Sequence, residues 1–229
     1  MTKSRWSDLR VRVASALVLV PLALLGLWLG GVVWDLMVLA FIVGLAREWL
    51  TLTWGRRHEM PRLAWFGVIY VLLPGVALLW LRARRPFGLD DSFFLLIVIW
   101  STDIGAYVVG RFVGGRRLAP SISPGKTWSG ALGGLLCGIL AGMILAAWVG
   151  PAGVGGYVGA AWAGFWLSVV AQIGDLFESW IKRRLGVKDS GQTIPGHGGL
   201  FDRLDGLLAA APVAALIALF AQIGMPLWL

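Results

Sequence analysis

The sequence predicts an all-α integral membrane protein, a polytopic bundle of about seven transmembrane helices that forms one domain over residues 1–229. Two observations support this fold class. Of the 229 residues, 58% are hydrophobic and only 14% are charged, whereas a soluble domain is typically about half apolar and about a quarter charged. The apolar residues also gather in runs of about 20 residues, the length that a helix needs to cross a bilayer. A bilayer can cover this much apolar surface, and the core of a soluble domain cannot.

Runs with few or no charges mark the individual spans. Three are expected in the N-terminal part, residues 13–81, and the others in residues 92–229, which also carry the polar segments described below. The uncharged run 127–174 is too long for one crossing, and the glycine-rich residues 150–156 divide it into two. The expected spans are therefore 13–31, 32–54, 63–81, 92–110, two within 127–174, and 205–220.

Positive charge sets the expected orientation. The formal net charge of +8 fits cytoplasmic loops rich in Lys and Arg, attraction to anionic lipid or an anionic substrate. With the N-terminus in the cytoplasm, all 20 Lys and Arg residues fall in cytoplasmic segments except Arg82, Arg84 and Arg85. We therefore expect a cytoplasmic N-terminus and an external C-terminus. The three exceptions leave two alternatives open. Either this arginine cluster is tolerated on the external side, or the third span is wrongly assigned.

Several ionisable residues stand at the ends of apolar spans, where their burial is costly and needs a reason. Asp175, Glu178 and Lys182 are spaced i, i+3 and i+7, so on a helix they share one face. Asp202 and Asp205 open the last span after a glycine-rich loop. All of them fall on the expected cytoplasmic side, where a water-soluble anionic substrate could reach them.

These residue types together indicate a chemistry. Carboxylate oxygens suit Mg²⁺, and the sequence has no Cys/His set for zinc. Lys and Arg suit phosphate oxygens, and glycines let backbone N–H groups approach phosphates closely. Carboxylates that hold Mg²⁺ beside cations that hold phosphate are typical of phosphoryl or nucleotidyl transfer. A charged loop that only fixes the topology is the alternative.

Three regions of the chain resemble a known family. Residues 179–205, SWIKRRLGVKDSGQTIPGHGGLFDRLD, closely resemble the signature of the phosphatidate cytidylyltransferases, also called CDP-diacylglycerol synthases. Residues 102–130 are similar to the other characteristic region of that family, and so is the end of the second span at Glu48. Beside Arg47, Glu48 is expected to form an interfacial ion pair. The resemblance extends over roughly the whole chain.

The resemblance implies a single transmembrane cytidylyltransferase domain. Its reaction would transfer CMP from CTP to phosphatidic acid, giving CDP-diacylglycerol and pyrophosphate for phospholipid synthesis. The expected cofactor is Mg²⁺, with a second metal ion of unknown identity as an open alternative. The expected partners are CTP, phosphatidic acid and membrane lipid, with a homodimer as an open alternative and no nucleic acid. The expected location is the inner (cytoplasmic) membrane of a bacterium, with the active site open to the cytoplasm.

The resemblance also implies roles for individual residues. Asp175 and Asp202 are the expected principal Mg²⁺ ligands, with Glu178 and Asp205 as further candidates that either bind the ion or support its ligands. Because the lipid phosphate is already ionised, His197 is expected to shape the glycine-rich turn or to contact phosphate rather than to act as a general base. The expected catalytic residues are Asp175, Lys182, Lys188, His197, Asp202 and Asp205. The expected substrate-binding residues are Asp103, Arg111, Ser123, Lys126, Thr127, Arg183, Asp189 and Arg203.

Other interpretations stay open. In one, Asp103 is only a buried polar group paired with Arg111. An enzyme acting on another lipid phosphate or a lipid alcohol would carry a similar signature, and a CTP-dependent lipid kinase would transfer the γ-phosphate instead. An ion-coupled transporter is disfavoured, because the acids cluster at the cytoplasmic ends of the spans and no inverted repeat is evident.

Overall fold

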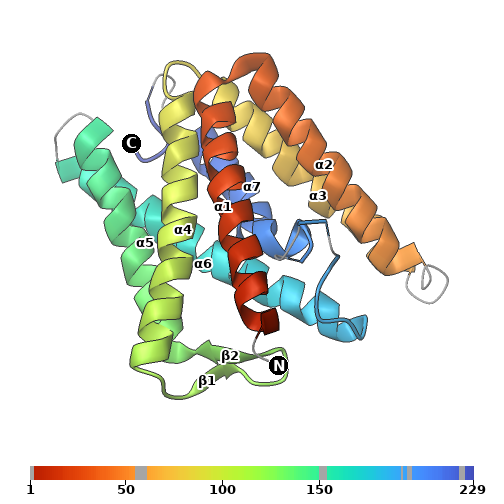
Figure 1. Cartoon of the computed structure of the whole chain (residues 1–229). Coiled ribbons are helices and arrows are strands. Elements are labelled where there is room, and N and C mark those ends of the chain that lie inside the picture. The colour runs from red at the N-terminus through yellow and green to blue at the C-terminus, as the bar shows by residue number, and fades with distance from the viewer. Residues whose placement is uncertain (1–2, 55–60, 150–153, 192, 195–197, 222–224) are drawn as a thin grey trace.

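The computed structural model describes residues 3–54, 61–149, 154–191, 193–194, 198–221 and 225–229. This part of the chain contains seven helices, packed into one bundle, and one small antiparallel sheet (Figure 1). The helices are α1 (Lys3–Leu29), α2 (Gly31–Thr53), α3 (Pro61–Ala83), α4 (Gly88–Phe112), α5 (Trp128–Val149), α6 (Val154–Arg184) and α7 (Phe201–Phe220). The strands are β1 (Arg117–Ala119) and β2 (Ser123–Thr127).

Six of these helices, α2 to α7, are long and apolar enough to cross a membrane, as judged over the described residues. The other helix, α1, adds the apolar segment Leu17–Leu29 after a charged start. The all-α, polytopic prediction is thereby confirmed. Several helices extend beyond the predicted spans, and two of these extensions carry site residues: α6 continues to Arg184, and α7 begins at Phe201. As a result, the charged residues at 175–184 and 202–205 lie on helices rather than in loops.

Glycines bring α4 and α5 into close contact. A Cβ atom added to Gly134 would lie 2.6 Å from the carbonyl oxygen of Thr102, and one added to Gly130 would lie 2.7 Å from that of Ala106. Small residues let helix backbones approach one another in this way. The glycines of α5 therefore serve packing within the chain, and they hold β2, which leads directly into α5, against the end of α4.

The two ends of the bundle differ. Figure 1 shows the start of α1 and the β1–β2 hairpin at one end, which we call the hairpin end. The C-terminal residues 225–229 and the connection between α3 and α4 lie at the opposite end. The start of α1 and the C-terminal residues therefore lie at opposite ends of the bundle.

Two of the arginines at the opposite end, Arg82 and Arg84, have partners within the protein. Arg82 Nε donates a hydrogen bond to the carbonyl oxygen of Leu27 at 2.8 Å. Arg84 forms an ion pair with Asp91, which is fully buried and also accepts the backbone N–H of Leu227 at 2.8 Å. Buried charges of this kind are tolerated when they are paired. These contacts account for two of the three arginines that contradict the charge pattern, whereas Arg85 is exposed. The third predicted span corresponds to α3, which is long and apolar enough to cross a membrane.

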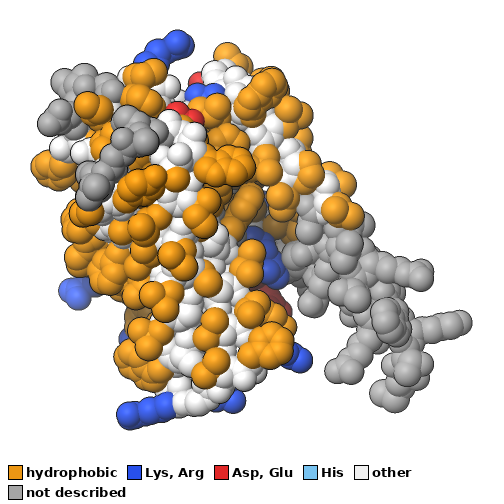
Figure 2. All heavy atoms as spheres, turned by 90° about the vertical axis from the view of Figure 1, so that its left-hand side faces the viewer, with side chains coloured by type: hydrophobic (Ala, Val, Ile, Leu, Met, Phe, Trp, Pro, Cys, Tyr) orange, Lys and Arg blue, Asp and Glu red, His pale blue; other side chains and the backbone are white. Residues whose placement is uncertain are grey.

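Apolar side chains cover the outside of the bundle. In Figure 2, hydrophobic side chains occupy the middle of the face shown, and Lys and Arg stand out near its upper and lower ends. Trp148 on α5 is 87% exposed and Phe220 on α7 is 85% exposed. Soluble monomers rarely expose large contiguous apolar areas, so this surface fits contact with lipid.

Candidate active site

A cavity of about 920 Å³ lies at the hairpin end, between α4, the β1–β2 hairpin, α6 and α7. It is lined by carboxylates and cationic side chains from two regions far apart in the sequence, residues 103–131 and 172–205. The carboxylates are Asp103, Asp175, Glu178, Asp189, Asp202 and Asp205. The cationic side chains are Arg111, Arg117, Lys126, Lys182 and Arg203.

One face of α6 forms a wall of this cavity. Asp175, Glu178, Ser179 and Lys182 all line it. The helix is unbroken through these positions, and steps of three or four residues place side chains on the same face. The helical spacing read from the sequence is therefore confirmed as a shared face.

The β1–β2 hairpin closes the cavity on another side. Gly114 and Gly115 lead from α4 into β1 with φ angles of 63° and 104°, left-handed values that favour glycine. Thr127 ends β2, and its buried hydroxyl accepts the backbone N–H of Gly130 at 3.1 Å. This bond caps the start of α5. Ser123 and Thr127 both line the cavity, and the Thr127 hydroxyl, expected to bind phosphate, is also engaged in helix capping.

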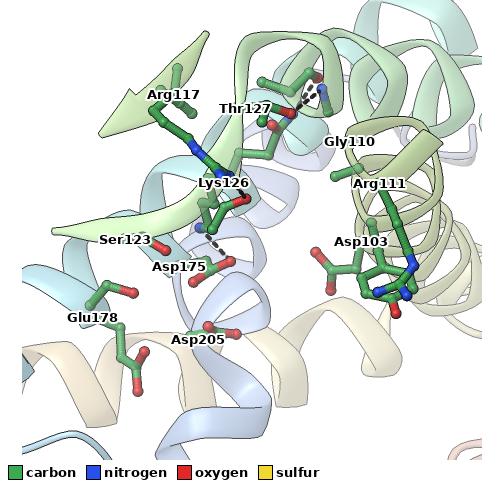
Figure 3. A pocket seen from close by; sticks show the side chains of 18 of the residues that line it. Asp103, Gly110, Arg111, Arg117, Ser123, Lys126, Thr127, Asp175, Glu178 and Asp205 are labelled. Carbon is green, nitrogen blue, oxygen red and sulfur yellow. Dashed lines mark hydrogen bonds and ion pairs between the residues drawn. The ribbon is translucent and has the colours of Figure 1, made fainter. Parts of the chain in front are cut away.

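An ion pair joins the hairpin to α6. Lys126 Nζ lies 2.5 Å from Asp175 Oδ2, and both side chains point into the cavity (Figure 3). Asp103 faces them from α4 (Figure 3). Among the ion pairs of the described residues, none joins Asp103 to Arg111. The alternative that Asp103 is merely a paired buried group therefore finds no support.

Asp175, Glu178 and Asp205 form a compact carboxylate group, and one oxygen from each lies within 4.8 Å of the others. A Mg²⁺ ion bound at about 2.1 Å places opposite ligands about 4.2 Å apart, so this spacing is close to that of a metal site. Glu178 Oε1 is buried and has no hydrogen-bond partner in the described part of the chain. Such an atom is costly, and a cation would satisfy it. The residues therefore fit a hard cation such as Mg²⁺.

Asp202 is held by the protein instead. Its Oδ1 accepts a hydrogen bond from Lys182 Nζ at 2.7 Å. Its Oδ2 accepts the backbone N–H groups of Ser190 and Gly199, both at 2.9 Å. Asp202 is not one of the three carboxylates of that group, although the family resemblance makes it an expected principal metal ligand. Asp205 joins the group in its place.

Several described N–H groups of the glycine-rich loop and of the helix start that follows it bond within the protein. Two of them bond to Asp202, as above, and those of Leu200 and Phe201 bond to Glu48 at 2.7 and 2.9 Å. A phosphate-binding nest needs N–H groups that point toward the ligand, so these four are not available for one. The nearby cationic side chains of α4 and the hairpin are Arg111, Arg117 and Lys126.

Three expected site residues are not placed in the cavity. Lys188 is exposed and is not among the residues that line the cavity. Arg183 is also exposed, and its Nε donates to the carbonyl oxygen of Ile122 in the hairpin turn at 3.3 Å. Arg183 therefore supports the position of the hairpin against α6. His197 lies outside the described residues.

Comparison with known proteins agrees with this geometry. The sequence profile of the cytidylyltransferase family matches residues 56–221, a range that includes every residue lining the cavity. The chain belongs to the cytidylyltransferase family.

Relatives of this cytidylyltransferase cover most of its length. It is 37% identical over 265 residues to the phosphatidate cytidylyltransferase of Brucella suis, across 96% of this chain and 97% of the relative. It is 35% identical over 214 residues to that of Rickettsia bellii, across 90% of this chain and 89% of the relative. It is 39% identical over 167 residues to the phosphatidate cytidylyltransferase of Haemophilus influenzae, across 69% of this chain and 57% of the relative.

Some residues that line the cavity of this cytidylyltransferase were not predicted from the sequence. Tyr107 follows Asp103 by four residues and so shares its face of α4. Gln172 precedes Asp175 by three residues and is a polar side chain in an otherwise apolar span. Arg117 lies in β1 beside the glycine turn. The helical spacing could have indicated the first two, whereas Arg117 depends on the hairpin.

Proposed function

We propose that this cytidylyltransferase transfers CMP from CTP to phosphatidic acid, giving CDP-diacylglycerol and pyrophosphate. The observation that carries the proposal is the cavity, in which a compact carboxylate group faces cationic side chains at one end of a membrane bundle. A nucleotide from water and a lipid from the bilayer can meet at such a place. The relatives named phosphatidate cytidylyltransferase from Brucella suis and Rickettsia bellii align with 96% and 90% of the chain and support the choice of substrates.

The reaction is an in-line substitution at phosphorus. A phosphate oxygen of phosphatidic acid forms a bond to the α-phosphorus of CTP. The bond from that phosphorus to the oxygen bridging toward the β-phosphorus breaks, and pyrophosphate leaves with the bonding electrons. Because the attacking oxygen is already anionic, no general base has to remove a proton from it. The task of the protein is to bring two polyanions together and to hold them in line.

In this proposal, cationic side chains of α4 and the hairpin bind the substrate phosphates. Arg111 and Arg117 project from different sides of the cavity (Figure 3), so they can contact two separate phosphate groups. A planar guanidinium binds phosphate through two parallel hydrogen bonds. Lys126 lies on the hairpin next to the carboxylate group and adds a third positive charge.

Asp175, Glu178 and Asp205 are the proposed Mg²⁺ ligands. When bound there, the ion would neutralise negative charge on the triphosphate and on the leaving pyrophosphate. Lys182 keeps Glu178 in place, because its Nζ lies 2.9 Å from Glu178 Oε2 and 2.7 Å from Asp202 Oδ1. A second metal ion and a homodimer stay predictions from the family resemblance.

Labelled CTP separates this reaction from that of a lipid kinase. Purified protein, phosphatidic acid and Mg²⁺ are incubated with CTP that carries label at either the α- or the γ-phosphate. We expect the α-label in the lipid product and the γ-label in pyrophosphate. EDTA should stop the transfer, and added Mg²⁺ should restore it. Lipid labelled only from the γ-phosphate would instead indicate a kinase. Faster labelling of another lipid phosphate than of phosphatidic acid would show that the other lipid is the preferred substrate.

We also propose that the hairpin end faces the cytoplasm across the inner membrane of a bacterium. The relatives are bacterial, and the hairpin end carries the basic segments, whereas Arg82 and Arg84 at the opposite end have partners inside the protein. Ser121 in the hairpin turn and Arg85 at the opposite end are both exposed, so each can report one side.

The orientation is tested by labelling in spheroplasts with a membrane-impermeant maleimide, in a Cys137→Ala background. Arg85→Cys should react in intact spheroplasts, and Ser121→Cys should react only after permeabilisation. The reverse pattern would overturn the orientation. Reaction of both positions from the same side would overturn the odd number of crossings.

A further inference from the structure

We propose that Glu48 on α2 is a positioning residue of the reaction: it fixes the first turn of α7 and, through it, the carboxylates of the active site. This inference rests on the function proposed above. Glu48 precedes residues 56–221, which match the family profile, and it does not line the cavity. The sequence suggests an ion pair with Arg47, but consecutive residues on a helix do not face each other. In the described part of the chain, the carboxylate bonds to a different region.

Four N–H and hydroxyl groups from residues 142 to 153 positions later in the chain surround the Glu48 carboxylate. Its Oε1 accepts the backbone N–H of Leu200 at 2.7 Å and the hydroxyl of Thr193. Its Oε2 accepts the backbone N–H of Phe201 at 2.9 Å, and the hydroxyl oxygen of Ser190 lies 3.2 Å from the same atom. The N–H groups at the start of a helix have no partner within that helix. Glu48, which is only 5% exposed, therefore caps α7 from another helix.

A network of bonds connects Glu48 to the active site. The Ser190 hydroxyl lies 3.2 Å from Glu48 Oε2 and 3.0 Å from Asp202 Oδ2, so it stands between two carboxylates. Asp202 accepts a hydrogen bond from Lys182 at 2.7 Å. Lys182 in turn pairs with Glu178, a member of the carboxylate group, at 2.9 Å. The connected side chains thus lead from α2 to the cavity wall on α6.

The cap also determines where Asp205 lies. Leu200 and Phe201 stand where α7 begins, and Asp205 follows about one turn later. A shift or rotation of this first turn would move Asp205 relative to Asp175 on α6. Misplacement of a reacting group by about 1 Å can lower a rate by about 100-fold. The capping contact on α2 is therefore expected to control the geometry of the reaction.

The space around the carboxylate is closely filled. A Cβ atom added to Gly199 would lie 2.0 Å from Ser190 Oγ and 2.7 Å from Glu48 Oε2. A helix N-terminus is often a binding site for phosphate, but here the side chain of Glu48 occupies that position. The role of Glu48 is therefore to fix the position of the α7 N-terminus, and this N-terminus is not a binding site for substrate phosphate.

Glu48→Gln tests whether both carboxylate oxygens are needed, because glutamine has almost the same side-chain volume as glutamate. Each oxygen of Glu48 accepts one backbone N–H, from Leu200 or from Phe201. In either orientation of the glutamine amide, its NH₂ group faces one of these N–H groups, and a buried donor loses its acceptor. Glu48→Asp keeps two carboxylate oxygens on a shorter side chain, so it should retain part of the capping of α7 that Glu48 provides.

The experiment compares Glu48→Gln, Glu48→Asp and Ser190→Ala with the wild-type protein. Turnover and KM for CTP are measured with α-labelled CTP. Mn²⁺ binding is measured by electron paramagnetic resonance, and the unfolding temperature is measured by heating the protein in detergent. Thr53→Val is the matched control, because Thr53 is also a buried polar residue on α2, bonded to the Trp49 carbonyl oxygen within that helix.

We expect Glu48→Gln to lower kcat by about 10- to 100-fold and to weaken Mn²⁺ binding. KM for CTP should change less, since the proposed phosphate-binding side chains belong to α4 and the hairpin. Glu48→Asp and Ser190→Ala should fall between Glu48→Gln and the wild type, and Thr53→Val should match the wild type.

A merely structural role for Glu48 gives a different result. The yield and the unfolding temperature of Glu48→Gln would then fall, while kcat and Mn²⁺ binding of the folded fraction would match the wild type, and this outcome would overturn the proposal. If Glu48→Gln does not fold, Ser190→Ala tests the proposal instead, because this variant leaves both backbone hydrogen bonds of Glu48 in place. Wild-type kcat and wild-type Mn²⁺ binding in Ser190→Ala would also overturn the proposal. Absence of CMP transfer by the wild-type protein would instead overturn the proposed function, and Mn²⁺ binding would still test Glu48.

Discussion

Asp205→Asn is expected to lower CMP transfer by about 100- to 1,000-fold without lowering the unfolding temperature. Asp205 contributes one of the three oxygens of the carboxylate group, together with Asp175 and Glu178. An amide is neutral and binds Mg²⁺ more weakly than a carboxylate does. The fold should not suffer, because three neighbouring acids repel one another and neutralising one of them relieves that repulsion.

Turnover over a Mg²⁺ titration and thermal unfolding with and without Mg²⁺ check this prediction. A ligand that binds the folded state raises its stability, so Mg²⁺ should raise the unfolding temperature of the wild type but not that of Asp205→Asn. Asp175→Asn should behave in the same way. Asp35→Asn is the matched control, because Asp35 is an exposed acid on α2 away from the cavity. Wild-type turnover in Asp205→Asn would contradict its assignment as a metal ligand.

Most of the fold could be predicted from the sequence, because a bilayer fixes both the length and the composition of a spanning helix. The helix ends were less predictable. The helix α6 continues through Asp175 to Arg184, and α7 begins before Asp202. Hydropathy alone gives no signal there, since a helix that leaves the apolar region can continue with charged residues.

The β1–β2 hairpin could be recognised only as a polar segment. Its strands have 3 and 5 residues, too few to show the alternation of apolar and polar residues that indicates a strand. The hairpin takes its position from contacts far away in the sequence, such as Lys126 with Asp175 and Arg183 with the carbonyl oxygen of Ile122. No local pattern contains that information.

The site could be predicted in part. The spacing of Asp175, Glu178 and Lys182 follows a local rule of the helix, so their shared face was readable. Asp202 and Asp205 could not be told apart, because both stand at the start of the last span. What separates them is the conformation of the preceding loop, which directs its N–H groups to Asp202. That conformation depends on distant side chains, and a sequence pattern does not show them.

Asp202→Asn is therefore expected to lose stability as well as activity, unlike Asp205→Asn. Asp202 Oδ2 accepts the N–H and the hydroxyl of Ser190, at 2.9 and 3.0 Å, and the N–H of Gly199 at 2.9 Å, while Oδ1 accepts Lys182 at 2.7 Å. In one orientation, the NH₂ group of asparagine would face the loop N–H groups. In the other orientation, it would face the ammonium group of Lys182. Either way a largely buried donor loses its acceptor.

The size of this effect follows from burial. The side chains of Lys182 and Asp202 are 15% and 8% exposed, and removing one partner of a buried ion pair costs about 3–5 kcal/mol. Lys182 keeps its contact with Glu178, so the free energy of unfolding should fall by about 3 kcal/mol, at the lower end of that range. For a chain of this length, the unfolding temperature should then drop by roughly 6–12 °C.

The comparison of Asp202→Asn with Asp205→Asn decides between two roles for Asp202. A metal ligand would lose turnover and the stabilisation by Mg²⁺ while keeping the unfolding temperature measured without Mg²⁺. A residue that holds the loop would lower that temperature and still show a rise on addition of Mg²⁺, since the carboxylate group itself is intact. The bonds of Asp202 to the loop and to Lys182 favour the second result. Identical behaviour of the two variants would contradict the division of roles between these neighbouring acids.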